Sequence, residues 1–227
     1  LTTHPMTAVT TPILLDMMQK PLSSFRCPSD TGPPLQVPQG NIHHLLDGKG
    51  TAVSNYIGVN GSRYNRAVNN NAINVGMFIE NVSNGLKEVL DGSSNTAFFG
   101  ERKWATHDIN NRLRISRAAN IFGVRRGNAN TSGSNGVFGT GRNKLNYNWR
   151  NTGRARMSFS SEHPGGAQFA LCDASVRFIP DTIDNDFNIY PRGADNQSRI
   201  NNAAAGRADT AWESFLGRHD GVSNPLP

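Results

Sequence analysis

The fold is decided by residues 161–179, which read SEHPGGAQFALCDASVRFI. His163 is followed by Pro-Gly-Gly, which cannot continue a helix, because proline fixes φ and glycine adopts extended or left-handed backbone without steric conflict. Residues 168–172 are apolar and aromatic, and residues 176–179 alternate as a half-buried strand does. Asp173-Ala-Ser between them is typical of a turn. The stretch therefore predicts a β-hairpin.

Outside this hairpin, short apolar segments alternate with Gly- and Asn-rich turns, a pattern typical of a sheet with packing helices. A Thr at the N-cap, Pro12 in the first turn and Pro21 beyond the end predict a helix over residues 12–20. We expect one α+β domain over residues 1–227, with long irregular loops around an antiparallel sheet. The expected strands are residues 53–59, 77–79, 96–99, 168–172 and 176–179, and the expected helices are residues 12–20, 84–90 and 209–216, the last with Asp209 as N-cap.

Composition indicates a loop-rich extracellular protein. Of 227 residues, 36% are hydrophobic and 18% are charged, and Asn, Ser, Thr and 23 Gly make up much of the rest. Eleven Phe, three Trp and four Tyr supply anchors for a core, which argues against a disordered chain. The longest apolar run, around residues 13–18, is interrupted by Asp16 and is too short to span a bilayer, so we expect no membrane insertion.

The net charge of +6 is carried mainly by arginine, and many of the arginines lie between Arg102 and Arg156. A basic stretch that includes Tyr147 and Trp149 invites a nucleic-acid interpretation, since arginine binds phosphates and aromatic rings stack on bases. The chain has no zinc-finger or aromatic RNP-type motif. We therefore expect these arginines to pair with carboxylates within or between subunits, or to face an anionic cell-surface polymer, and we expect no nucleic acid as partner.

The two cysteines, Cys27 and Cys172, lie far apart in the sequence. This arrangement fits either one long-range disulfide or two buried thiols. A zinc site is disfavoured because neither cysteine belongs to a pair with C-x2-C spacing. In an oxidising compartment a bridge would close most of the domain into one covalent loop, so we predict a Cys27–Cys172 disulfide.

Four landmarks occur in order along the chain: SFRCPSD at residues 24–30, SNYIG at 54–58, DGSSNT at 91–96 leading to Gly100-Glu101, and His163 ten positions before Asp173. With them the chain resembles the pilin-like secreted proteins of planctomycete-type bacteria, whose signature is a His, nine residues, then Asp-Gly. Ala174 stands where that signature has glycine. The resemblance covers about residues 21–217.

The resemblance implies an extracellular or cell-surface location, a pilin- or pseudopilin-like globular fold, and association with copies of itself or with related subunits. It makes His163, Gly165, Gly166, Asp173 and Glu101 a structural motif. Members of the family begin with a prepilin-type leader and a long hydrophobic helix, which this sequence lacks. For the sequence as given, the resemblance therefore does not by itself imply membrane anchoring or polymerisation through such a helix.

His163 and Asp173 also admit a catalytic interpretation, because a histidine oriented by a carboxylate is half of a nucleophilic site. The sequence has no Gly-x-Ser-x-Gly nucleophile elbow. The structural interpretation is that His163 bonds backbone at the turn entrance while Asp173 caps the hairpin turn. Glu101, at the end of a buried strand, is expected to bond His163 or to pair with Arg102 or Arg177.

Two further sets of residues are candidates for binding. Closely spaced oxygen ligands suit Ca²⁺, and a loop after the last hairpin strand supplies Asp181, Asp184 and Asp186, although it lacks the Gly and the distal Glu of an EF-hand. An aromatic platform and cationic clamp for a glycan or other solute would be Tyr147, Trp149 and Arg150.

The sequence thus favours a non-enzymatic extracellular structural protein, namely a pilin- or pseudopilin-like subunit of a filament, a secretion apparatus or a cell-surface assembly. The alternative is a surface module that captures a glycan or other solute. We expect no catalytic residues and no cofactor, with structural calcium at the three aspartates as a minor alternative.

Overall fold

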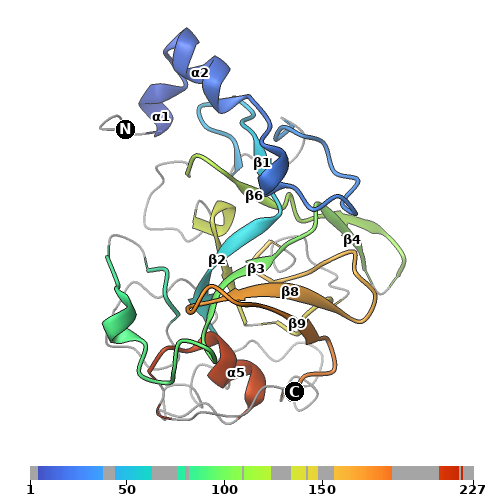
Figure 1. The fold of residues 1–227 in the computed structure, drawn as a ribbon. Coiled ribbons are helices and arrows are strands. Elements are labelled where there is room, and N and C mark those ends of the chain that lie inside the picture. The colour runs from blue at the N-terminus through green and yellow to red at the C-terminus, as the bar shows by residue number, and fades with distance from the viewer. Residues whose placement is uncertain are drawn as a thin grey trace. The chain divides into compact units, whose positions relative to one another are not determined.

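The computed structural model describes residues 5–37, 44–62, 76–79, 82–108, 110–123, 134–141, 143–147, 156–185, 210–219 and 221. These residues form antiparallel sheets and short helices (Figure 1), which confirms the predicted α+β class. No helix among them is long and apolar enough to cross a membrane.

The chain divides into two compact units, each built from separate stretches of sequence. Unit 1 comprises Leu1–Ile57, Arg102–Phe138 and Asn148–Arg156, and unit 2 comprises Gly58–Glu101, Gly139–Tyr147 and Met157–Pro227. The expectation of a single domain stays a prediction.

Unit 1 is made of short elements. Its helices are α1 (Pro5–Ala8), α2 (Pro12–Met18), η1 (Ser23–Phe25) and η4 (Ser134–Gly136), and its two-stranded sheets join β1 (Val53–Ser54) to β6 (Ala119–Asn120) and β4 (Ala105–His107) to β5 (Leu113–Ile115). Helix α2 has Pro12 at its first position, as predicted, and ends two residues before the predicted end. It packs Met18 against Leu46 and Val9.

The main sheet has five strands, in the order β7 (Phe138–Thr140), β2 (Tyr56–Gly61), β3 (Ala97–Glu101), β8 (Gly166–Leu171) and β9 (Val176–Pro180). The last two form the predicted hairpin, with an antiparallel register from Gly166↔Pro180 to Ala170↔Val176. Strand β8 also pairs antiparallel with β3.

One face of this sheet carries the core of unit 2. Phe169 of β8 lies 5.2 Å from Phe159, 5.8 Å from Trp212 and 5.2 Å from Phe215, measured between ring centroids. Both Trp212 and Phe215 belong to helix α5 (Ala211–Leu216), and the Trp212 indole N–H donates to the Gly141 carbonyl at 3.1 Å. Burying four aromatic rings against one another is the largest apolar contribution visible in unit 2.

Three details of the prediction are wrong. Residues 84–90 form only a 3-10 turn, η3 (Leu86–Glu88), because Gly85 starts it and Leu86 and Leu90, 64% and 74% exposed, have no core to cover. The strand expected at residues 77–79 is reduced to an isolated bridge between Ile79 and Val82. At the last helix the N-cap is Thr210, whose hydroxyl accepts from the Glu213 N–H; Asp209 lies outside the described residues.

Candidate functional site

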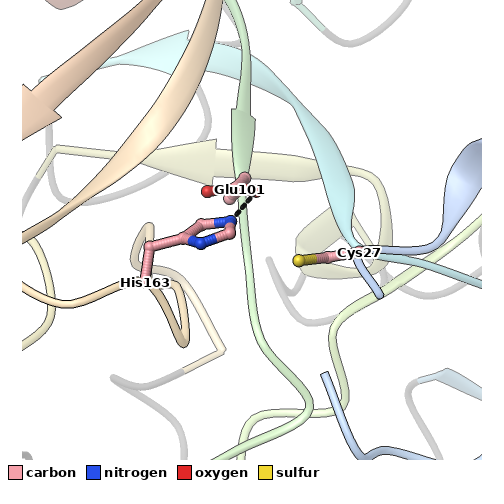
Figure 2. A group of neighbouring side chains, drawn as sticks. All are labelled: Cys27, Glu101 and His163. Carbon is pink, nitrogen blue, oxygen red and sulfur yellow. Dashed lines mark ion pairs between the residues drawn. The ribbon is translucent and has the colours of Figure 1, made fainter. Parts of the chain in front are cut away.

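A histidine–carboxylate pair lies where β3 ends and β8 begins. The Nε2 atom of His163 is 3.3 Å from Oε1 of Glu101; Figure 2 marks this contact with a dashed line. The Glu101 side chain is only 4% exposed, whereas that of His163 is 32% exposed. His163 is positioned by a bend in which its N–H donates to Ser161 Oγ at 2.9 Å. Gly165 then turns the chain into β8 with a φ of 77°, a conformation that favours glycine.

The Glu101 carboxylate also bonds the main chain. Its Oε2 accepts a hydrogen bond from the Gln168 N–H at 2.7 Å, and the Glu101 carbonyl accepts from the Ser160 N–H at 2.9 Å. One buried residue therefore holds the end of β3, the start of β8 and the His163 turn together. Of the three partners expected for Glu101, the structure shows His163, and the buried carboxylate has the partners that its burial requires.

The structure does not bring His163 and Asp173 together, as the catalytic interpretation would require. The two residues lie beyond opposite ends of β8, whose six residues extend at about 3.3 Å each, so they are separated by the whole strand. Asp173 Oδ1 instead accepts from the Ser175 N–H at 2.9 Å and the Ser175 hydroxyl at 2.6 Å, which confirms its predicted role as turn cap. These hydrogen bonds lower the pKa of Asp173.

Sequence analysis missed a second polar cluster, which lies wholly within unit 1. Asn55 is 1% exposed, and its Oδ1 accepts from the Cys27 N–H at 3.0 Å. Its amide nitrogen donates to the Asp30 carboxylate and, at 3.1 Å, to the Arg102 carbonyl. Asp30 in turn accepts from the Trp104 N–H at 2.8 Å. The cluster joins two of the landmarks, since Cys27 and Asp30 belong to SFRCPSD and Asn55 belongs to SNYIG. That these residues lie in landmarks was the only feature of the sequence that could have pointed to the cluster.

The basic stretch of unit 1 is held mainly by backbone carbonyls. Arg102 is fully buried, and its guanidinium donates to the carbonyls of Ala118, Asn135 and Phe138. Burial, with a smaller contribution from Arg156, lowers the pKa of Arg102 to about 9. Arg102 is therefore not the partner of Glu101 that the sequence suggested.

Among these arginines, Arg114 has the expected carboxylate partner. Its guanidinium donates two hydrogen bonds to Asp108 Oδ2, at 2.7 and 2.9 Å. The other oxygen of Asp108 accepts from the N–H groups of Asn110 and Arg112. The Arg112 N–H bond and the Arg114 contacts hold the pKa of Asp108 at about 2 against the opposing effect of its burial.

The predicted disulfide is wrong, because neither Cys27 nor Cys172 forms one. Each cysteine is buried, and its backbone N–H donates to a residue of its own unit. The Cys27 N–H donates to Asn55, and the Cys172 N–H donates to the Thr96 carbonyl at 3.0 Å. Burial, and then the Asp173 charge, raise the pKa of the Cys172 thiol to about 11, which keeps it protonated at neutral pH. Cys27, also drawn in Figure 2, belongs to unit 1.

The remaining candidates lie partly outside the described residues, which exclude Asp186, Trp149 and Arg150. Asp184 positions the start of α5: its carbonyl accepts from the Trp212 N–H at 3.1 Å. Tyr147 is 45% exposed, and its N–H donates to the Lys144 carbonyl. The described residues therefore do not assemble either the calcium set or the aromatic platform, and both stay predictions.

The fold and the two polar clusters define an α+β protein whose landmark side chains hold main chain in place. Residues 3–186 match the family model SBP_bac_10, described as a protein of unknown function (DUF1559). The match covers most of the chain, and the protein belongs to this family of uncharacterised bacterial proteins. Comparisons with the curated proteins and with the solved structures found no match.

Proposed function

We propose that this protein is a non-enzymatic structural subunit of an extracellular or cell-surface assembly, related to pilins and pseudopilins. The main support for the proposal is that the side chains of the landmark residues form hydrogen bonds to the main chain. Glu101 and Asn55 are buried and bond main chain on neighbouring segments, and Asp173 closes the hairpin turn. Residues engaged in this way stabilise a scaffold.

The turn of the hairpin supports the relationship to the His-x9-Asp-Gly signature. Ala174 has a φ of 68°, in the left-handed region where glycine is favoured. A glycine after Asp173 would relieve that strain, which gives the signature a physical reason. The histidine of the signature also has a structural role here, because Glu101 at the end of β3 holds the turn that contains His163.

Electron microscopy of the purified native protein tests the proposal. Ordered polymers or defined oligomers are expected of a structural subunit. Monodisperse monomers whose melting temperature rises with an added glycan would instead establish the solute-binding alternative, for which exposed Tyr147 is the available described residue.

A separate measurement addresses catalysis. If a hydrolytic activity of the native protein were lost in His163→Ala while folding stayed intact, the non-enzymatic assignment would be overturned. His163→Ala with unchanged assembly and a modest loss of stability is the expected result.

A further inference from the structure

In the part of the chain that the structure describes, β9 has a strand partner on one side of its backbone and none on the other. Among the described residues it is the last strand of the five-stranded sheet and pairs only with β8 (Figure 1). Toward β8, the Ser175 carbonyl accepts from the Leu171 N–H at 2.8 Å, and the Asp181 N–H donates to the Gly165 carbonyl at 2.8 Å. Because backbone groups alternate along a strand, the odd positions face β8 and the even positions, 176, 178 and 180, face outward.

The side chains at the even positions are apolar and exposed. Val176 is 65% exposed and Phe178 is 43% exposed. They lie on the sheet face opposite Phe169, in register with Ala170 and Gln168 of β8. Phe99 of β3 pairs with Ala170, so the side chains of Val176, Ala170 and Phe99 form one row across three strands on this face of the sheet. An open edge that also carries exposed apolar side chains is the arrangement that another extended strand can complete.

We infer that β9 pairs antiparallel with β9 of a second copy, so that two main sheets join into one continuous sheet. This inference names the contact of the proposed structural subunit and rests on that proposed function. We assign a second copy of the chain as the partner of this edge, because the outward N–H and C=O groups of β9 can pair with those of another β9. Val176 and Phe178 offer outward N–H and C=O groups, Pro180 offers only a carbonyl, and a two-fold axis lets each group meet its counterpart.

Charge disfavours the register centred on Arg177, and the outward hydrogen-bonding groups favour the register centred on Phe178. Pairing Val176 with Phe178 of the partner would place Arg177 directly opposite its own copy, and like charges in that position are destabilising. Centring the pair on Phe178 places Arg177 opposite Ile179 instead. It also sets the two Phe178 rings beside each other and lets the Val176 N–H donate to the Pro180 carbonyl. The Phe178-centred register is therefore the one we assign.

Sedimentation of the full chain from about 1 µM to about 1 mM tests the contact. We expect concentration-dependent dimers, weakened more than about tenfold by Phe178→Lys, because a charge on an edge strand opposes strand pairing. Leu90→Lys is the matched control: it adds the same charge at an apolar residue of unit 2 that is 74% exposed, and it should leave dimerisation unchanged. Equal dimerisation of Phe178→Lys and wild type, or a monomeric wild type throughout, would overturn the inference.

Disulfide trapping tests the register. Phe178→Cys should oxidise to a covalent dimer, because directly opposed Cα atoms lie about 5.5 Å apart. Val176→Cys should not, since its counterpart is several residues away in this register. Trapping of Val176→Cys as readily as Phe178→Cys would refute the assigned pairing.

Electron microscopy of the same variants separates this inference from the proposed function. Ordered polymers that persist in Phe178→Lys would refute the β9 contact and leave the structural function standing. Dimers that depend on Phe178 without any higher assembly would support the β9 contact and count against a filament.

Discussion

The two units are stabilised by different kinds of buried side chain. In unit 2 four aromatic rings pack together, and a single carboxylate ties the sheet to the turn before β8. Unit 1 combines small apolar clusters with buried polar side chains: Asn55 and Arg102 are almost fully buried and bond the main chain of distant segments. The net charges differ as well. Unit 1 has thirteen Lys and Arg against four Asp, and unit 2 has ten against thirteen acidic residues.

This difference shows two ways in which a chain with a modest apolar fraction can fix long irregular segments in place. Where a sheet supplies a flat face, burial of aromatic area is sufficient. Where the strands have only two or three residues, as in unit 1, side-chain amides and guanidinium groups satisfy backbone groups that have no ladder partner. Unit 1 should therefore be sensitive to loss of hydrogen bonds, and unit 2 to loss of volume.

The largest expected effect is in the aromatic core. Trp212→Ala removes a fully buried ring and should lower the free energy of unfolding by about 3–5 kcal/mol. Chemical denaturation measures it, and hydrogen exchange should show the loss of protection in unit 2. Leu86→Ala, at a 64% exposed residue of the same unit, should stay within about 0.5 kcal/mol. Comparable losses in the two variants would contradict a core centred on Trp212.

The second effect tests the polar cluster of unit 1. Asn55→Ala leaves the Cys27 N–H and the Arg102 carbonyl without the side-chain partner. Each buried polar group left unpaired costs about 1–3 kcal/mol, so we expect a loss of about 3 kcal/mol. Asn95→Ala is the control, because the amide of Asn95 makes one long 3.5 Å bond to the Asp91 carbonyl. An Asn55→Ala variant as stable as the control would mean that unit 1 does not depend on this cluster.

A smaller loss is expected at the Glu101 clamp. Glu101→Ala should cost about 2 kcal/mol, since the Gln168 N–H loses its acceptor. Glu101→Gln keeps an oxygen for that N–H and should cost about half as much, and His163→Ala should cost less than about 1 kcal/mol because the imidazole is partly exposed. A double-mutant cycle measures the coupling. Zero coupling would show that the contact does not stabilise the fold.

The stability difference between wild type and Asp108→Asn should depend on pH: it is present at neutral pH and is lost in acid. The pKa of Asp108 is about 2 in the folded protein, below the ordinary value of 3.8, so the unfolded chain takes up the proton first. Its contribution to stability is therefore complete above about pH 4 and is lost as pH falls toward pH 2. Asp108→Asn should be less stable than wild type at neutral pH, and the gap should narrow across that window. A gap independent of pH would contradict the depressed pKa.

Local patterns predicted the hairpin, because proline, glycine and alternating residues encode a turn and two strands within 19 residues. The order of the landmarks also placed His163 among the three expected partners of Glu101, and the structure has that contact. Local patterns could not predict the Asn55 cluster, whose partners lie 25 to 47 positions away with no periodic signal. The cysteine prediction failed for a related reason: composition suggests a compartment but does not place two sulfur atoms together.

The smallest expected effect is a gain at the hairpin turn. Ala174 is held at a φ of 68°, which a residue with a Cβ adopts with strain, so Ala174→Gly should raise the free energy of unfolding by up to about 1 kcal/mol. The same substitution at Ala170, the next-to-last residue of β8, should instead destabilise by about 0.5–1 kcal/mol, because glycine gains freedom in the unfolded chain without relieving strain. Thermal or urea unfolding measures both changes. A gain in the free energy of unfolding for Ala174→Gly and a loss for Ala170→Gly would show that the gain comes from the turn geometry. Destabilisation at both positions would remove the physical reason offered for a glycine in the family signature.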